Sequence, residues 1–336
     1  MSCKVKLKEQ DVFFEIEENE TVLEAALRQG HNLPYGCRNG LCGSCKAIVV
    51  TGDITYPDGT PEGLSESDIK QDFALLCQAK TTGDLSIKVR TVETAADIKL
   101  RQFPCRVTTC EKLNKDVIRL ILELPKTERL QFLAGQYIDI LMRDGKRRSF
   151  SLANPPDKDQ ILELHIRYYD GGLFSEYAFK GLTEKALLRI EGPLGQFTLH
   201  ESDRPIIMIA GGTGFAPVKS MIEYSLKNND KRSIQLYWGA RTKTDLYLDN
   251  TAIQWSIDNE HIKYIPVLSD IENLNGWTGK TGFVHNAVME DHTDLSGHDV
   301  YACGPPPMIN AIVESFPANG LDKERLYSDS FEFAAN

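Results

Sequence analysis

The sequence predicts a three-domain protein, in which a small α/β domain precedes an antiparallel β-barrel and a parallel α/β domain. Three observations support this prediction. Thr91 to Lys99 form a polar linker, short strands between turn residues follow it, and strands then alternate with helices to the end of the chain. We therefore place the domains at residues 1–92, 100–201 and 203–336.

Length and charge exclude some classes of function. The chain has 336 residues, which is enough for several ordinary cores without disulfide or zinc staples. Its net charge is −10, and residues 1–90 carry 10 basic and 14 acidic groups. Nucleic-acid binding depends on Lys and Arg that neutralise phosphates. We therefore exclude nucleic acid as a partner.

No targeting segment is evident in the sequence. The first residues lack the apolar core of a signal peptide, and no apolar run approaches the roughly 20 residues needed to cross a bilayer. We therefore expect a cytoplasmic protein that does not use a membrane. In that reducing compartment the eight cysteines are more often metal ligands or buried side chains than disulfides.

The first domain begins with short strands at residues 4–8 and 12–16 and an amphipathic helix. Thr21 and Glu24 form a capping-box pattern at the start of this helix, and Gly30 is its predicted C-cap. Two further strands are expected at 46–50 and 85–90.

Three cysteines and three glycines crowd into the segment "YGCRNGLCGSCK". Cys37, Cys42 and Cys45 have the spacing C-x4-C-x2-C, and Cys77 follows later in the chain. This is the plant-type ferredoxin spacing, in which four thiolates hold a 2Fe-2S cluster. Structural zinc sites instead pair two C-x2-C knuckles, and Cys77 has no such neighbour. The other cysteines outside the last domain, Cys3, Cys105 and Cys110, have no ligand spacing and are expected to be buried or inert.

The second domain contains six predicted strands and a single helix at 171–182. The strands are expected at 104–113, 116–124, 136–142, 147–152, 161–169 and 186–193.

Two segments of this domain have cofactor-binding chemistry. On a strand, Arg148 and Phe150 share one face and Ser151 lies on the other, and these side chains suit a diphosphate, a flat heterocycle and a ring nitrogen. An edge strand with ordinary alternation explains the same residues equally well. The helix start at Gly172 offers free amides to a second phosphate, although a plain Gly-Gly turn is the alternative.

The third domain opens with "IIMIAGGTGFAPVKSM", a strand that leads through a Gly-rich turn into a helix. The turn is not G-x-G-x-x-G, yet it lies where a pyrophosphate binds in such folds. Later strand ends bring Arg241 and Cys303 to the same crevice. The alternatives are a solvated surface arginine and a small buried cysteine.

Together and in this order, these motifs resemble the ferredoxin-NADP reductase superfamily, in the arrangement with an N-terminal plant-type 2Fe-2S domain. The resemblance covers essentially the whole chain. It implies a β-grasp fold for the first domain, a β-barrel that binds FAD or FMN, and a Rossmann-like domain that binds NAD(P)H. It also supports Cys37, Cys42, Cys45 and Cys77 as the cluster ligands.

The resemblance implies flavin contacts. Arg148 would hold the FAD diphosphate, Phe150 would stack on the isoalloxazine, and Ser151 would face its N5 edge as a catalytic residue. The family pattern has tyrosine where this chain has Phe150, so stacking remains but a hydrogen bond is lost. The other implied FAD contacts are His165, Ile166, Gly172, Leu173, Phe174, Ser175 and Phe331.

The resemblance also implies nucleotide contacts. Cys303 would order the nicotinamide as a catalytic residue. Arg241 would meet a 2′-phosphate, whereas Asp245 would repel one and suit a ribose hydroxyl, so NADH is the expected donor and NADPH the alternative. The other implied contacts are Gly212, Thr213, Gly214, Gly304, Pro305 and Met308.

Within the superfamily, segments such as "GKRRSFSLANPP" and "TGFVHNAVMEDHTDLS" resemble the CDP-4-dehydro-6-deoxyglucose reductases, which pass electrons to a dehydrase of a CDP-hexulose. Reductases of aromatic-ring dioxygenases and multicomponent monooxygenases share the layout. We expect an iron-sulfur flavoprotein that oxidises NAD(P)H and delivers single electrons to a partner protein, either a dehydrase or an oxygenase component. A one-electron carrier or redox sensor is the non-enzymatic alternative.

Overall fold

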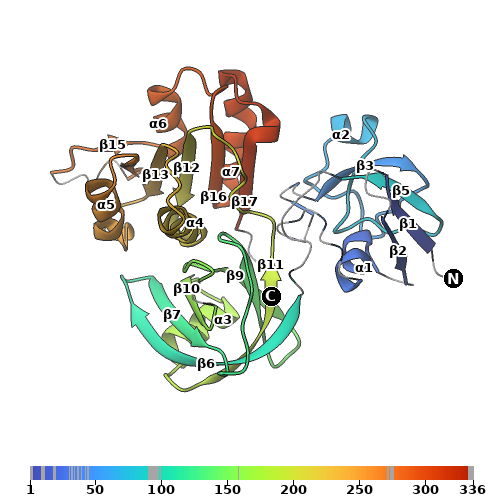
Figure 1. The fold of residues 1–336 in the computed structure, drawn as a ribbon, viewed down its shortest axis with the longest axis horizontal. Helices are drawn as coiled ribbons and strands as arrows, with labels where there is room; N and C mark the ends of the chain where they lie inside the picture. The colour runs from blue at the N-terminus through green and yellow to red at the C-terminus, as the bar shows by residue number, and fades with distance from the viewer. Residues whose placement is uncertain are drawn as a thin grey trace. The chain divides into compact units, whose positions relative to one another are not determined.

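The computed structural model describes most of the chain, in two compact units, Met1–Leu100 and Arg101–Asn336 (Figure 1). Within the described residues, no helix is long and apolar enough to cross a membrane. The domain boundaries at residues 92, 201 and 203 stay predictions. The described residues are 3–8, 12–17, 20–29, 31, 33, 35, 38, 40–41, 43, 45–89, 98, 100–157, 159–270, 272 and 276–331.

The first unit contains a five-stranded mixed sheet. Its order is β2-β1-β5-β3-β4, in which only β1 and β5 pair in parallel. The predicted capping box is confirmed, because Thr21 and Glu24 bond each other's backbone amide. The C-cap is Gln29, one residue before the predicted Gly30, which lies outside the described residues. The elements are β1 (Cys3–Leu7), β2 (Val12–Ile16), α1 (Val22–Arg28), β3 (Lys46–Thr51), α2 (Glu66–Lys70), β4 (Phe73–Leu75) and β5 (Leu85–Lys88).

The second unit begins with the six predicted strands, which form an antiparallel sheet in the order β10-β7-β6-β11-β8-β9. A bridge between Leu152 and Leu164 joins its two edge strands and closes it into a barrel. Apolar side chains such as Phe103, Leu120 and Ile138 fill the interior. The elements are β6 (Arg101–Lys112), β7 (Val117–Glu123), β8 (Tyr137–Leu141), β9 (Arg147–Ser151), β10 (Ile161–Arg167), α3 (Leu173–Lys180) and β11 (Leu187–Leu194).

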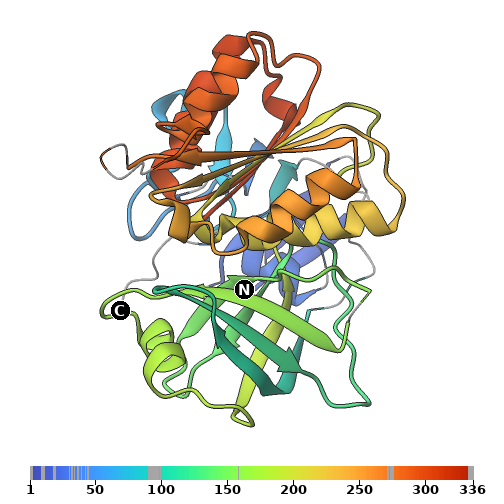
Figure 2. The ribbon, with the colours of Figure 1, turned by 90° about the vertical axis from the view of Figure 1, so that its left-hand side faces the viewer.

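A six-stranded parallel sheet follows, in the order β15-β14-β13-β12-β16-β17. Figure 2 shows helices on both faces of this sheet, as the strand-helix alternation predicts. The elements are β12 (Ile206–Gly211), η1 (Gly212–Gly214), α4 (Phe215–Lys227), β13 (Ile234–Ala240), η2 (Lys243–Asp245), α5 (Asp249–Asp258), β14 (Ile262–Leu268), β15 (Lys280–Thr281), α6 (Val284–Asp291), β16 (Asp299–Gly304), α7 (Pro306–Ser315), η4 (Phe316–Asn319), η5 (Lys323–Arg325) and β17 (Leu326–Ser330).

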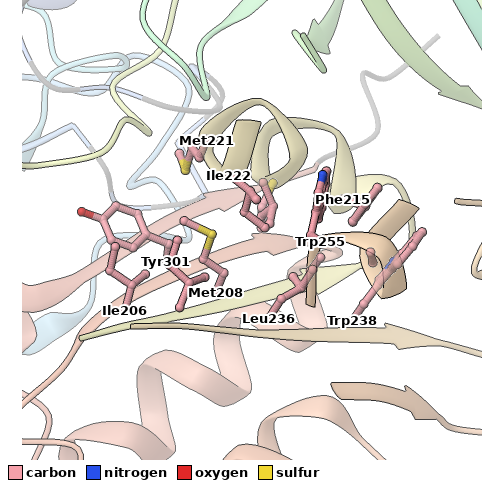
Figure 3. Close-up of a cluster of buried hydrophobic side chains, with 14 of the residues drawn as sticks. Ile206, Met208, Phe215, Met221, Ile222, Leu236, Trp238, Trp255 and Tyr301 are labelled. Atoms are coloured by element: carbon pink, nitrogen blue, oxygen red, sulfur yellow. The ribbon is translucent and has the colours of Figure 1, made fainter. Parts of the chain in front are cut away.

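The central strand β12 is buried along its whole length and supplies two cores. Ile206 and Met208 face the core that α4 covers (Figure 3), whereas Ile207 and Ile209 face the opposite core. Burial on both faces explains the continuous apolar run in the sequence. Because β13 and β16 flank β12 on either side, the chain order reverses here and leaves a crevice at the carboxyl ends of the strands.

Candidate cofactor sites

Two of the four predicted cluster ligands lie within the described residues, and both are buried. Cys45 and Cys77 are 3% and 5% exposed, and both thiols are free of disulfide bonds. The Leu76 amide donates to the Cys45 carbonyl at 3.2 Å, so the two cysteines lie on adjacent segments. Cys37 and Cys42 lie outside the described residues.

The backbone turns tightly at Gly40, five residues before Cys45. Gly40 has a φ of +87°, and a Cβ there would lie 2.9 Å from the Cβ of Pro61, so only glycine fits. Gln78, next to Cys77, donates to the Arg38 carbonyl at 2.9 Å and ties its own segment to the loop. Two buried cysteines on adjacent segments, tied to this turn, fit a 2Fe-2S cluster.

The flavin motif lies on β9, where Arg148 is opposite Ile140 and Phe150 is opposite Ile138 on β8. Nη1 of Arg148 donates to the Arg147 carbonyl at 2.7 Å. Its Nη2 is buried, with no hydrogen-bond partner among the described residues. Because an unpaired buried donor is costly, this nitrogen fits an anionic group such as a diphosphate. Ser151 is buried at the end of the strand.

The start of α3 lies beside β9, because the rings of Phe150 and Phe174 are 5.4 Å apart between centroids. Phe174 is buried in the barrel core, whereas Leu173 is exposed. The Ser175 hydroxyl accepts from the Tyr169 amide at 3.2 Å, so it closes the turn before the helix. Phosphate binding at Gly172 would therefore rely on backbone amides.

The structure places the side chains of His165 and Ile166 inside the unit. Both ring nitrogens of His165 are within 3.0 Å of protein partners, Tyr247 and Glu163. Ile166 is fully buried in the barrel core. A flavin contact at either residue would be made by the backbone of β10 and stays a prediction.

A cavity of about 540 Å³ lies at the carboxyl ends of the parallel strands, where dinucleotides bind in doubly wound folds. The predicted residues that line it are Gly212, Thr213, Arg241, Asp245, Pro305, Met308 and Phe331. The predicted residues Gly214, Cys303 and Gly304 do not line it.

Cys303 lies in the core beside this cavity and is fully buried. A Cβ on Gly214 would lie 2.0 Å from the Cys303 carbonyl oxygen, so the Gly-rich turn packs directly on the end of β16. Burial raises the pKa of the Cys303 thiol well above its ordinary value. The thiol is therefore neutral in the folded chain. Its catalytic role stays a prediction.

Asp245 and Arg241 lie together at the cavity. Oδ2 of Asp245 accepts from the amide and the hydroxyl of Thr242, at 3.0 and 2.8 Å. Its Oδ1 is buried, without a hydrogen-bond partner in the described part of the chain, and lies 3.7 Å from Nζ of Lys115. An acceptor oxygen is therefore free for a ligand hydroxyl.

Several residues that line the cavity are not evident from sequence patterns. Arg167 reaches it from the barrel and donates to Asp116 at 3.3 Å, and Tyr247 and His285 line it as well. Arg167 follows His165 on one strand face, but alternation does not reveal what that face meets. The contacts that place these side chains are long-range.

Family models match three successive parts of the chain. The 2Fe-2S iron-sulfur cluster binding domain matches residues 3–82, the oxidoreductase FAD-binding domain residues 104–199 and the oxidoreductase NAD-binding domain residues 208–314. The CDP-6-deoxy-L-threo-D-glycero-4-hexulose-3-dehydrase reductase of Yersinia pestis is 41% identical over 98% of this chain and 99% of its own. This chain belongs to the ferredoxin-NADP reductase superfamily.

Other members of the superfamily match over a similar length. Terephthalate 1,2-dioxygenase reductase component 1 of a Comamonas species is 32% identical over 98% of each chain. The crystal structure of the Amycolatopsis cytochrome P450 reductase GcoB superposes with a TM-score of 0.82, 31% identity and 98% coverage of each chain. The predicted fold class, the NAD(P)H-dependent oxidoreductase activity and the cofactors 2Fe-2S, FAD and NAD(H) are confirmed.

Proposed function

We propose that this reductase is cytoplasmic, oxidises NADH and supplies single electrons to a CDP-6-deoxyhexulose 3-dehydrase. The observation that carries the proposal is the 41% identity with the Yersinia pestis dehydrase reductase over nearly the full length of both chains. The terephthalate dioxygenase reductase is 32% identical over the same share. An oxygenase component is therefore the second candidate partner.

The bound cofactors supply the chemistry, because a flavin exchanges electrons in pairs or singly and a 2Fe-2S centre takes one. The protein chain holds these cofactors in position relative to one another. Arg148 would neutralise the flavin diphosphate with its unpaired Nη2, and the Gly212 turn would receive the nucleotide pyrophosphate. The buried thiols of Cys45 and Cys77 would hold the cluster away from water.

The preference for NADH rests on Asp245. Its Oδ1, which has no hydrogen-bond partner among the described residues and lies 3.7 Å from the exposed Lys115 ammonium, would accept a hydrogen bond from the 2′-hydroxyl of NADH, whereas the 2′-phosphate of NADPH would meet a carboxylate. Arg241 beside it is exposed and would attract either nucleotide. The carboxylate therefore decides the preference.

The decisive experiment gives the loaded reductase NADH under anaerobic conditions, together with the purified dehydrase and its CDP-sugar. A parallel reaction contains the terminal oxygenase component of a dioxygenase, with its aromatic substrate and oxygen. Turnover with the dehydrase alone supports the proposal, and turnover with the oxygenase alone overturns it.

Two variants test whether electrons leave through the cluster. Cys77→Ser removes a predicted ligand, whereas Cys110→Ser changes a half-buried thiol of the barrel that lies 3.8 Å from the Ala178 carbonyl. We expect Cys77→Ser to abolish electron delivery to the dehydrase and Cys110→Ser to retain it. Delivery by Cys77→Ser at the parent rate would show that the cluster is not the exit.

A further inference from the structure

Four polar residues form a junction between the barrel and the parallel sheet, in which His165 and Lys219 are buried and Glu163 and Tyr247 are partly buried. Glu163 and His165 belong to β10 of the barrel, Lys219 to α4, and Tyr247 to the segment before α5. Burial of a polar group without a hydrogen-bond partner destabilises the fold, so we consider the hydrogen-bond partners of each residue in turn. We call this group the Lys219 junction.

Lys219 is the centre of the junction, with a side chain that is 10% exposed. Its Nζ donates to the Ala153 carbonyl at 3.1 Å and lies 3.2 Å from Glu163 and 3.0 Å from Glu223. An ammonium has three N–H groups, and each has an acceptor here. Next to it, the Ser220 hydroxyl donates to the Asn154 carbonyl at 2.7 Å. The first turns of α4 are therefore bonded to the barrel by two side chains.

His165 and Tyr247 make the second tie. Nε2 of His165 is 3.0 Å from Oε1 of Glu163, and Nδ1 is 3.0 Å from the Tyr247 hydroxyl. Burial lowers the pKa of His165 and raises that of Tyr247, so the imidazole is neutral and the phenol protonated. Because the Glu163 carboxylate only accepts, Nε2–H donates to it and Nδ1 accepts from Tyr247. The donor and the acceptor are therefore fixed in both hydrogen bonds of His165.

The junction lies next to both cofactor segments. On the barrel side it holds Ala153 and Asn154, directly after the β9 strand that carries Arg148. On the other side, α4 begins directly after the Gly212 turn. Tyr247 itself lines the nucleotide cavity. Any shift at the junction would therefore change the distance between the two segments.

We propose that Lys219 and Tyr247 are positioning residues of this reductase, which hold the nucleotide cavity at a fixed place relative to the Arg148 strand. Neither side chain needs to touch a reacting atom for this role. Most groups that line the nucleotide cavity, from the Gly212 turn to Phe331, lie on the parallel α/β sheet and its loops, and only a minority, such as Arg167, reach it from the barrel. Loss of the junction should therefore impair electron input much more than nucleotide binding.

The test compares Lys219→Met and Tyr247→Phe with the parent holoprotein, using NADH and no partner protein. Its failure would therefore leave the dehydrase proposal intact. We expect the limiting rate of flavin reduction to fall about tenfold to a hundredfold in Lys219→Met, since small misplacements have effects of this size. Tyr247→Phe retains the ring, removes only the hydroxyl and should show a smaller loss of the same kind.

Two measurements do not depend on turnover. The dissociation constant of NAD⁺ for Lys219→Met, measured by calorimetry, should stay within about twofold of the parent, because Lys219 does not line the nucleotide cavity. Amide hydrogen exchange in residues 152–154 should accelerate in Lys219→Met, because α4 no longer holds that segment.

Two matched control variants distinguish a loss of positioning by the junction from a general loss of protein stability. Lys227→Met removes an ion pair to Asp157 between the same helix and the barrel, but its side chain is 56% exposed. Tyr237→Phe removes a buried hydroxyl that bonds Asp291 at 2.8 Å on the opposite face of the sheet. Both should keep the parent rate of flavin reduction.

Two results would overturn the proposal. One is a parent rate of flavin reduction in both junction variants. The other is weaker NAD⁺ binding by tenfold or more at an unchanged limiting rate, which would make the junction part of nucleotide binding. If Lys219→Met does not fold, Tyr247→Phe alone decides between these outcomes.

Discussion

At the scale of single residues, Arg148 is the predicted ligand of the FAD diphosphate. Its buried Nη2 has no acceptor among the described residues. Arg148→Ala should weaken FAD binding by about tenfold or more, because a charge-assisted contact to the diphosphate is lost. Equilibrium dialysis of FAD measures the effect. Arg189→Ala, which removes an exposed arginine on β11 bonded to Gln102 at 3.3 Å, should retain FAD, and an equal loss in both variants would contradict the assignment.

Cys303 gives a second test at this scale. Cys303 is fully buried and its backbone carbonyl packs against the turn at Gly214, so Cys303→Ala leaves a small void close to that turn. We expect slower flavin reduction by NADH, by about tenfold, with the FAD content unchanged. Stopped-flow absorbance at saturating NADH measures the rate. Reduction at the parent rate would show that the cysteine only fills space.

We propose that Asp245 determines the nucleotide preference. Asp245→Asn keeps an oxygen that can accept from Thr242 but removes the negative charge. The ratio of kcat/KM for NADH to that for NADPH should fall by about tenfold, because the 2′-phosphate is no longer repelled. Steady-state kinetics with both donors test this expectation. A parent protein that prefers NADPH would refute the proposed role of the carboxylate.

At the scale of elements, the Gly-rich turn η1 depends on its contact with β16. Gly214→Ala would place a Cβ 2.0 Å from the Cys303 carbonyl oxygen. We expect a loss of about 1–3 kcal/mol in the free energy of unfolding, together with weaker NADH binding. Gly297→Ala is the control, because a Cβ there meets nothing within 4 Å, and its effect should not exceed about 1 kcal/mol. Similar unfolding curves for both variants would contradict this packing.

The elements show what local sequence determines. The Thr21 capping box, the barrel strands and the buried strand β12 follow from spacing and periodicity within a few residues. The three-residue strand β4 and two-residue strand β15 are too short to produce a pattern.

Parts of the candidate site depend on contacts that spacing cannot reveal. The pairs His165–Tyr247 and Glu163–Lys219 are 82 and 56 residues apart in sequence. Ser175 has the right position for a phosphate ligand, but its hydroxyl already accepts a hydrogen bond from the Tyr169 amide. The serine at this position can be predicted from the sequence. The competition between the Tyr169 amide and a phosphate for its hydroxyl is evident only in the folded chain.

At the scale of the whole molecule, the Lys219 junction predicts how stability depends on pH. Burial lowers the pKa of His165 below 6.5, so the unfolded chain binds a proton there that the folded chain does not. Burial alone would raise the pKa of Glu163, but the His165 hydrogen bond and the Lys219 charge outweigh it and lower the pKa from 4.5 to about 2. Stability from Glu163 is thus present above pH 4.5 and is lost as the pH falls towards 2.

The free energy of unfolding should therefore decrease as the pH falls below about 6.5, with His165 contributing up to about 1.4 kcal/mol per pH unit. Denaturant unfolding at pH 7.5, 6.5 and 5.5 would measure this slope. His165→Gln should flatten it in that range, whereas Glu163→Gln should act mainly below pH 4.5. An unchanged slope in His165→Gln would show that other groups control the acid sensitivity.

The central claim is that electrons from NADH reach the 2Fe-2S cluster within this one chain. The most direct measurement adds NADH anaerobically to protein loaded with FAD and the cluster, and records the electron paramagnetic resonance spectrum of the frozen sample. We expect the signal of a reduced 2Fe-2S centre, which Cys77→Ser should lack. A flavin that is reduced by NADH while the intact cluster stays oxidised would show that electrons do not pass from the flavin to the cluster.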